Sequence, residues 1–128
     1  LQPTSPLRTV EMIDQCIEVL IDERVDAVWT VSKVDLKYHP LKQLVLNSDT
    51  KLGSLFDETG LNIIARQQLS DTFVRNGACY VFSRDCIVGQ KTIYGRRLKL
   101  YELHDQQVSI DNLDDLALAE RILIEKEE

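Results

Sequence analysis

The sequence has few of the residues that usually mark a disulfide framework, a metal centre or a nucleotide loop. Its three cysteines (Cys16, Cys79 and Cys86) are widely spaced and include no CxxC pair. This argues against disulfides and zinc and favours a reducing cytoplasm. Two histidines, His39 and His104, offer little material for a metal cluster or a catalytic triad. The five glycines form neither a GxGxxG nor a P-loop pattern.

Long apolar runs and an excess of positive charge are also missing. No run approaches the roughly 20 residues that cross a bilayer, and no signal-peptide pattern opens the chain. Fifteen Lys and Arg against 21 Asp and Glu give a net charge of −6. Because a nucleic-acid binder needs a basic face, this balance argues against DNA or RNA as a partner. The 128 residues, 44% hydrophobic, suit one domain with one core.

Hydrophobic spacing predicts a helix near each end of the chain. Apolar residues recur at helical spacing over residues 9–24, and Thr9 is placed to be the N-cap. A final helix over residues 113–126 has an apolar stripe that includes Leu116 and Ala119. Asp111 is its expected N-cap, with Asp114 three residues later as a weak capping box.

Three segments have the composition of strands: residues 26–34, 77–82 and 98–103. The first is almost continuously apolar or β-branched, as in a parallel-sheet strand covered on both faces. The third alternates, with leucines on one face and Lys99 and Tyr101 on the other. Alternating strands and helices predict an α/β domain with a mainly parallel sheet. The more polar residues 35–70, with a hairpin at 43–56, form an expected arm.

Two polar loops are candidate binding sites. Pro3 and Pro6 stiffen the first, which lowers the entropic cost of binding a polar ligand, although the same loop can simply cap the next helix. The second precedes the strand at Gly77, and its arginines suit a carboxylate or phosphate ligand, or equally a solvated face. The polar residues of the two loops are Gln2, Thr4, Ser5 and Arg8, and Arg66, Gln67, Arg75 and Asn76.

Carboxylates form a third candidate set at the start of the last helix, at Asp111, Asp114 and Asp115. Acidic residues there usually cap the helix and interact with its dipole. A carboxylate that ends a strand can also hold Mg²⁺ against a triphosphate. Asp111 has the position for that role, and Asp115 fits a structural one. The histidines and cysteines fit structural roles, with His39 in a turn and the thiols buried.

Five short motifs follow one another along the chain. They are LQPTSPLR (residues 1–8), HPLK (39–42), RQ with NGACY (66–67 and 76–80), KTIYG (91–95) and ID with DLALAE (110–111 and 115–120). In order and spacing they resemble the acylneuraminate cytidylyltransferases, the CMP–sialic acid synthetases. The resemblance extends over the whole chain.

This resemblance implies a Rossmann-like nucleotidyltransferase with a three-layer, mainly parallel sheet. The implied reaction joins CTP to a nine-carbon 2-keto sugar acid with Mg²⁺ as the cofactor. The anomeric hydroxyl attacks the α-phosphate, and pyrophosphate leaves. The resemblance also implies a homodimer in which residues 35–70 are the dimerisation arm.

The resemblance assigns roles residue by residue. Gln2 would contact the sugar, Arg8 would support the catalytic site, and Asp111 would bind the metal. The sugar pocket would be lined by Lys42, Arg66, Asn76, Tyr80, Ile93 and Tyr94.

The chain departs from the family pattern in three ways. Ser109 stands where the family commonly has the first Asp of Asp-x-Asp, and Arg75 is displaced by one position from the usual Arg-x-Asn. The strand and the glycine- and cation-rich loop that hold the CTP phosphates in the family are not in this sequence. We therefore expect the C-terminal part of one cytidylyltransferase domain. The alternatives are a non-catalytic sugar-binding or dimerisation module and, third, a cytidylyltransferase for the eight-carbon acid Kdo.

Overall fold

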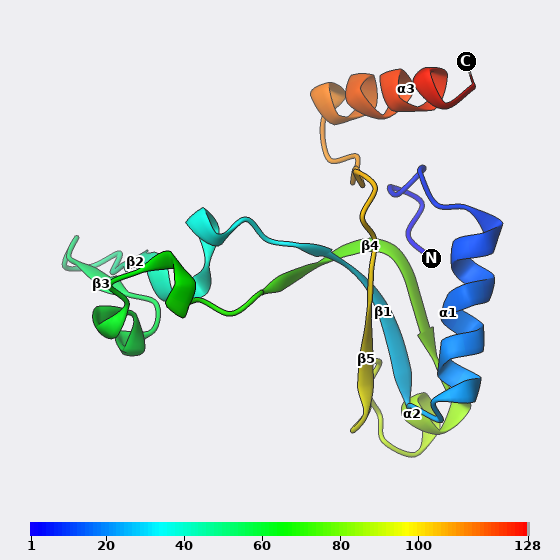
Figure 1. The fold of residues 1–128 in the computed structure, drawn as a ribbon, viewed down its shortest axis with the longest axis horizontal. Helices are drawn as coiled ribbons and strands as arrows, with labels where there is room; N and C mark the ends of the chain where they lie inside the picture. Colours follow the sequence, from blue (N-terminus) through cyan, green and yellow to red (C-terminus); the bar gives the residue numbers. More distant parts are fainter. Residues whose placement is uncertain (128) are drawn as a thin grey trace. The chain divides into compact units, whose positions relative to one another are not determined.

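The computed structural model describes residues 1–127, which contain three α-helices and five strands (Figure 1). The helices are α1 (Val10–Asp22), α2 (Arg84–Val88) and α3 (Leu113–Glu127). The strands are β1 (Ala27–Lys33), β2 (Leu44–Leu46), β3 (Gly53–Leu55), β4 (Phe73–Phe82) and β5 (Leu98–Glu102). Within residues 1–127, no helix has the length and apolar character needed to cross a membrane.

The chain divides into two compact units. The first consists of Leu1–Ser32 and the segment from Arg75 onward, and the second is Lys33–Val74. The first unit contains all three α-helices and most of a three-stranded sheet. The second contains a two-stranded hairpin and four short 3₁₀ helices, Leu36–Tyr38, Pro40–Lys42, Glu58–Asn62 and Arg66–Gln68.

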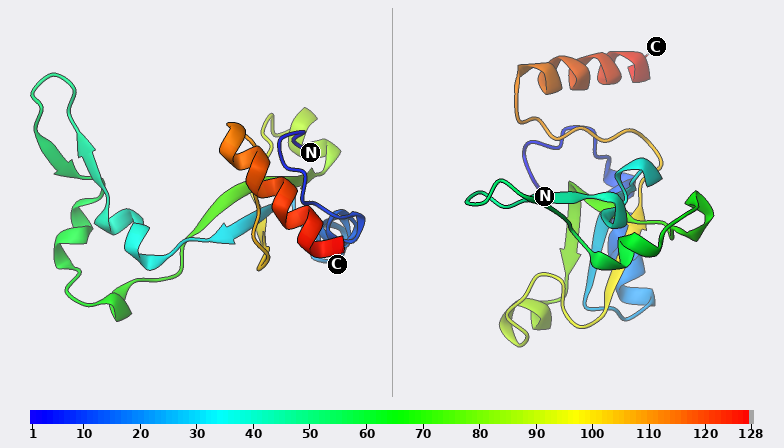
Figure 2. Two further views of the ribbon diagram at one scale, coloured as in Figure 1. Left: turned by 90° about the horizontal axis from the view of Figure 1, so that it is seen from above. Right: turned by 90° about the vertical axis from the view of Figure 1, so that its left-hand side faces the viewer.

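The larger sheet has the strand order β4-β1-β5, and Figure 2 shows it from two further sides. β1 and β5 are parallel, with Ala27 opposite Leu98 and Val31 opposite Glu102. The mixed α/β class is confirmed, but the sheet of the described residues is mixed and three-stranded, not the mainly parallel sheet of a Rossmann-like fold. The sheet is mixed because the chain, after leaving β1, returns and pairs with β1 as β4. There the Val34 N–H donates to the Thr72 carbonyl over 2.9 Å.

Helix α1 covers one face of this sheet. Cys16 of α1 packs against Val28 of β1 and Cys79 of β4, and all three side chains are buried. The three cysteines of the chain are free thiols, and desolvation raises the pKa of the Cys16 thiol to about 12. The prediction of buried, inert cysteines therefore agrees with the structure.

In the edge strand β5, the polar side chains face α1 and the leucines face away from it. Tyr101 faces α1, where its hydroxyl donates to Gln15, and the Lys99 ammonium lies 2.8 Å from the Glu23 carboxylate. Leu98 and Leu100 are on the opposite face and remain 38% and 43% exposed. The alternation was predicted correctly. The burial on both faces predicted for residues 26–34 agrees with the burial of the central strand β1.

Local capping explains where the helices of the first unit begin. The Thr9 side chain accepts from the Met12 N–H over 3.2 Å, which confirms Thr9 as the N-cap of α1. Helix α2 was not predicted, because five residues are too few to show a helical period. Its N-cap is Ser83, whose hydroxyl accepts from the Cys86 N–H. β4 begins four residues before the predicted strand at 77–82.

The second unit is built around the predicted hairpin. β2 and β3 are antiparallel, with Leu44 opposite Leu55 and Leu46 opposite Gly53. The Asn47 side chain accepts from the N–H groups of Asp49 and Thr50, which stabilises the turn. The unit exposes much apolar surface, at Leu44, Leu46, Leu52, Phe56, Leu61 and Ile64.

Asp26 links the beginnings of β1 and β5 in the first unit. Its carboxylate accepts from the N–H groups of Arg97 and Arg96, each over 2.8 Å. The Arg97 guanidinium donates to the carbonyls of Arg24 and Glu23, which follow the end of α1. The backbone hydrogen bonds from Arg97 and Arg96 hold the pKa of Asp26 below its usual value.

We expect Asp26→Asn to lower the Tm by several degrees at pH 7. A carboxyl with a depressed pKa in the folded state contributes stability above its unfolded pKa, and this contribution is lost as pH falls through the folded pKa. The difference between the two proteins should therefore shrink below pH 4. Thermal unfolding followed by circular dichroism from pH 7 to pH 3 measures it. Asp14→Asn, at an exposed position of α1, is the matched control, and equal Tm values for Asp26→Asn and the unmutated chain at pH 7 would contradict the prediction.

Candidate functional site

Residues 1–8 form a closed loop that Arg8 holds in shape. The Arg8 guanidinium donates to the carbonyls of Gln2 and Ser5, the latter over 2.8 Å. The Ser5 N–H donates to the same Gln2 carbonyl over 3.2 Å. Arg8, predicted to support the catalytic site, therefore acts in this structure on the loop that carries Gln2.

The loop lies directly against the backbone of β4. Gly77 has φ +76°, and a Cβ at this position would collide with the Gln2 side-chain oxygen and lie 3.1 Å from the Ser5 hydroxyl. Ser5 is 2% exposed, and its hydroxyl has no hydrogen-bond partner among the described residues. Gln2 and Ser5 therefore depend on the absence of a side chain at Gly77.

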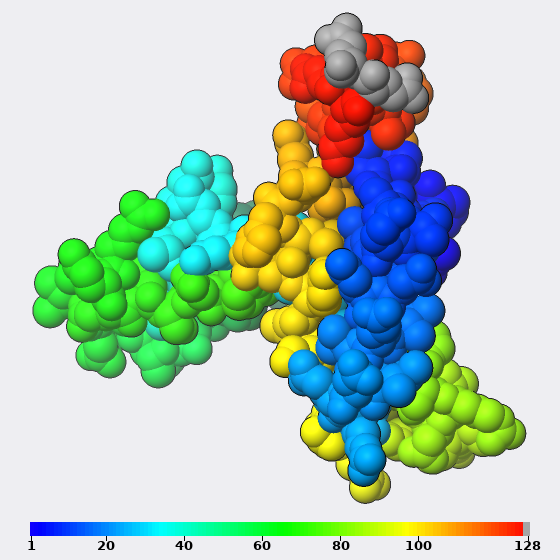
Figure 3. All heavy atoms as spheres, turned by 45° about the vertical axis from the view of Figure 1, so that its right-hand side comes forward, coloured from blue at the N-terminus to red at the C-terminus, as the bar shows by residue number. Residues whose placement is uncertain are grey.

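The same loop also contacts the segment that leads into α3. The Ile110 N–H donates to the Thr4 carbonyl over 2.8 Å, and Leu7 packs in a buried cluster with Val108 and with Ala119 of α3. Figure 3 shows the N-terminal residues beside this segment. Residues 1–8 thus contact both the NGACY motif and the segment that carries Asp111.

Asn76 is largely occupied within the sheet. Its side-chain oxygen accepts from the Thr30 hydroxyl over 2.8 Å and from the Ala78 N–H over 3.2 Å. Its amide nitrogen donates to the Ser32 hydroxyl over 3.0 Å. The residue ties β4 to β1, and one amide hydrogen is left for a ligand.

Asp111 does not cap α3, contrary to the sequence-based expectation. The Asn112 side chain accepts from the Asp115 N–H over 3.0 Å, and the Asp115 carboxylate accepts from the N–H groups of Asn112 and Asp111. The capping box is therefore Asn112 with Asp115, one position later than the predicted Asp111 with Asp114. The exposed carboxylate of Asp111 accepts no hydrogen bond from residues 1–127.

This free carboxylate fits one ligand position of Mg²⁺, which commonly takes one or two protein carboxylates and fills its other positions with water and phosphate oxygens. Over residues 1–127, no group of three or more His, Cys, Asp and Glu side chains is arranged to hold a metal ion. Ser109, two residues before Asp111, is also exposed.

We expect Asn112→Ala to lower the free energy of unfolding by about 1 kcal/mol, because the N-cap hydrogen bond to Asp115 is lost. Asp111→Ala should leave the midpoint of urea unfolding unchanged. Circular dichroism in urea compares the two variants with the unmutated chain. A larger loss in Asp111→Ala than in Asn112→Ala would restore Asp111 as the cap.

Aromatic side chains gather around Trp29 of β1. The indole N–H donates to the Ile93 carbonyl over 3.0 Å. The ring centre lies 5.2 Å from that of Tyr80 and 6.4 Å from that of Tyr94, both in edge-to-face geometry. The Arg75 guanidinium lies 5.9 Å from the indole ring. Three predicted site residues, Tyr80, Ile93 and Tyr94, are thus brought together by a residue that sequence reasoning missed.

Lys42 and Arg66 belong to the second unit. Lys42 is an exposed residue at the end of Pro40–Lys42. The Arg66 guanidinium lies 3.8 Å from the Asp35 carboxylate, and both line a recess of about 390 Å³ together with Lys33, Val34, Leu36 and Asp71. His39 is buried and its Nδ1 accepts from the Leu41 N–H over 3.1 Å, which agrees with its predicted place in a turn.

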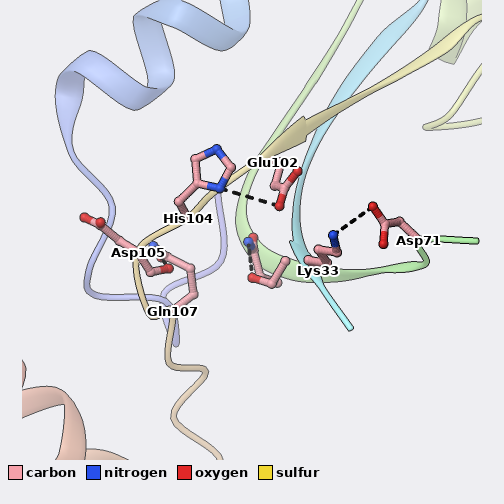
Figure 4. Close-up of polar contacts among 8 residues, drawn as sticks. Lys33, Asp71, Glu102, His104, Asp105 and Gln107 are labelled. Atoms are coloured by element: carbon pink, nitrogen blue, oxygen red, sulfur yellow. Dashed lines mark hydrogen bonds and ion pairs between the residues drawn. The ribbon is translucent and has the colours of Figure 1, made fainter. Parts of the chain in front are cut away.

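Two further polar contacts are drawn in Figure 4. The Lys33 ammonium lies 2.7 Å from the Asp71 carboxylate within the second unit. In the first unit, Nδ1 of His104 lies 3.5 Å from the Glu102 carboxylate. The His104 side chain is 83% exposed, which agrees with the structural or solvent-facing role expected for it.

No family model matches this chain. The resemblance to the acylneuraminate cytidylyltransferases therefore rests on the motifs alone.

Proposed function

We propose that this chain contributes the sugar-binding side and one metal carboxylate to a cytidylyltransferase. The enzyme would join CTP to a nine-carbon 2-keto sugar acid of the sialic type. The observation that carries the proposal is the double contact of residues 1–8. Gln2 lies against Gly77 of one motif, and Thr4 accepts from Ile110 of another. Residues 1–8 thus contact two other motifs that lie far from them in sequence.

Transfer of the nucleotidyl group requires mainly that the two substrates are positioned and that the charge on the phosphates is neutralised. The sugar's anomeric oxygen forms a bond to the α-phosphorus of CTP, and the bond to pyrophosphate breaks. Gln2, on a loop closed by Arg8, orients the sugar, and Asp111 supplies one oxygen ligand. Mg²⁺, when bound, neutralises the charge on the phosphate oxygens. By the resemblance, the sugar pocket would be lined by Lys42, Arg66, Asn76, Tyr80, Ile93 and Tyr94.

In this proposal, the mixed sheet is part of a larger Rossmann-like sheet, and residues 35–70 form the dimerisation arm. The arm assignment is supported by the exposed apolar side chains of the hairpin, since large apolar patches usually mark interfaces. Leu44 is 73% exposed and Leu46 is 66% exposed. A double substitution of both to lysine should shift sedimentation equilibrium from dimer to monomer. A protein that is monomeric before substitution would contradict this assignment.

Pyrophosphate release tests the activity directly. The protein as encoded by its gene is incubated with CTP, Mg²⁺ and N-acetylneuraminate, and in parallel with Kdo. We expect release with the nine-carbon acid and its loss on chelation of Mg²⁺. Release only with Kdo would support the eight-carbon alternative. No release with any acid, combined with measurable sugar binding, would support a non-catalytic sugar-binding module.

A further inference from the structure

Ser5 carries a buried hydroxyl group that makes no hydrogen bond in the fold. The residue is 2% exposed, and its Oγ has no hydrogen-bond partner among residues 1–127. A buried hydroxyl without a partner lowers stability, because the hydrogen bonds that it makes to water in the unfolded chain are not replaced. Most buried polar groups in folded proteins therefore have partners. Ser5 lies in the same loop as Gln2, the residue that the proposed function assigns to the sugar.

The backbone of this loop brings the side chains of Gln2 and Ser5 close together. Pro3 and Thr4 form a turn, which is closed by the hydrogen bond from the Ser5 N–H to the Gln2 carbonyl. The Cα atoms of the first and fourth residues of such a turn lie less than about 7 Å apart. The Arg8 guanidinium donates to the carbonyls of both residues. The backbone is therefore held, and the side-chain torsion angles of Gln2 and Ser5 remain free to change.

The side-chain oxygens of Gln2 and Ser5 lie beside the same point on β4, the position that a Cβ of Gly77 would occupy. A Cβ there would overlap the Gln2 oxygen and lie 3.1 Å from the Ser5 oxygen. The Gln2 side chain, like the Ser5 hydroxyl, makes no hydrogen bond to any of residues 1–127. The amide oxygen accepts hydrogen bonds and the hydroxyl can donate one. A rotation about side-chain bonds, with the backbone fixed, can therefore join the two groups.

We propose that Ser5 is a positioning residue for Gln2, and that its hydroxyl donates to the Gln2 amide oxygen when the sugar acid binds. This hydrogen bond fixes which end of the amide faces the ligand. The oxygen is turned toward Ser5, and the NH2 group is presented to an acceptor oxygen of the sugar acid. The inference rests on the proposed function, because it assigns the sugar contact of Gln2 to one end of its amide.

Ser5→Ala tests this role, because it removes the hydroxyl and keeps the Cβ. The KM for N-acetylneuraminate should rise about fivefold, the effect of losing one neutral hydrogen bond. The KM for CTP and kcat should stay within about twofold of their original values. The midpoint of urea unfolding should not fall, because the hydroxyl has no partner in the free protein over residues 1–127. A purely structural role predicts the opposite pattern, with lower stability and an unchanged KM.

Ser54→Ala is the matched control. It removes an exposed hydroxyl from β3, in the second unit, and should change neither the KM values nor the midpoint of unfolding.

A double-mutant cycle with Gln2→Ala shows whether Ser5 acts through Gln2. In that case, Ser5→Ala should raise the KM for N-acetylneuraminate no further once residue 2 is alanine. An equal rise in both backgrounds would overturn the role of Ser5 and leave the proposed function standing. An unchanged KM for Ser5→Ala in an active enzyme would have the same meaning.

Isothermal titration calorimetry with N-acetylneuraminate separates this inference from the proposed function. Sugar binding by the unmutated protein without pyrophosphate release would overturn the proposed function alone, and the same cycle would then be measured through Kd. A protein that neither binds the sugar acid nor releases pyrophosphate would overturn both, because Gln2 would then have no sugar to contact.

Discussion

Asp111→Asn should lower kcat for pyrophosphate release by about 100-fold, at least as much as the loss of a group that only supports a metal ligand usually costs. The structure motivates this expectation because the Asp111 carboxylate is exposed and accepts no hydrogen bond from residues 1–127, while Asn112 and Asp115 perform the capping. Asparagine keeps the shape of the side chain and removes its charge. The loss should therefore appear in turnover and in the concentration of Mg²⁺ required, and not in stability.

The matched control is Asp114→Asn, which removes an equal charge from an exposed residue of the first turn of α3. Steady-state assays over a range of Mg²⁺ concentrations, together with urea unfolding, separate the two effects. The control should retain close to full turnover. Unchanged turnover of Asp111→Asn at saturating Mg²⁺ would remove Asp111 from the metal site and leave it as a surface carboxylate.

Gly77→Ala should destabilise the first unit by about 1–3 kcal/mol. Backbone strain and steric overlap both lower the stability of a variant with a side chain at this position. A residue with a Cβ is strained at φ +76°, and the new methyl group would overlap the side-chain oxygen of Gln2. Because Gln2 must move, the KM for the sugar should rise as well. Urea unfolding measures the first effect, and pyrophosphate release measures the second.

Gly53→Ala provides the matched control. Gly53 lies in β3, and a Cβ there would have no atom within 4 Å. The double variant Gln2→Ala with Gly77→Ala separates the two costs, because it relieves the overlap and leaves the backbone strain. Partial recovery of stability is the expected result. Equal stability of the Gly77→Ala and Gly53→Ala variants would show that the loop does not depend on this glycine.

Periodicity and capping chemistry were sufficient to predict most elements of the fold. Helix α1 with Thr9 as its N-cap, the central strand β1, the hairpin and α3 all lie within a few residues of their predicted bounds. These features depend on neighbours in sequence. The direction of β4 depends instead on where the chain returns after residues 34–72, and no local pattern encodes that return. The capping register of α3 was wrong by one residue because Asp111 and Asn112 are both good caps.

Candidate site residues could be named from the sequence only where they lie inside a motif. Tyr80, Ile93 and Tyr94 were found in this way, and the structure brings them together. Trp29 was missed because its strand-like surroundings, Ala27 to Val31, explain it as an ordinary β residue. The one available signal was that it is the only tryptophan in the sequence. The internal role of Arg8 was also not predictable, because its partners are backbone carbonyls.

The backbone hydrogen bond between Val34 and Thr72 affects which changes of residues 35–71 the fold tolerates. It closes the intervening segment at its base. A change in the length of that segment therefore affects the stability of the sheet through the entropy of loop closure. Each doubling of such a loop costs only about 0.6 kcal/mol. Insertions, deletions or exchange of residues 35–71 are therefore compatible with the pairing of β1 and β4. Such changes alter Lys42, Arg66 and the surface of the hairpin, whereas the contacts of Gln2, Gly77 and Ile110 involve no residue of that segment.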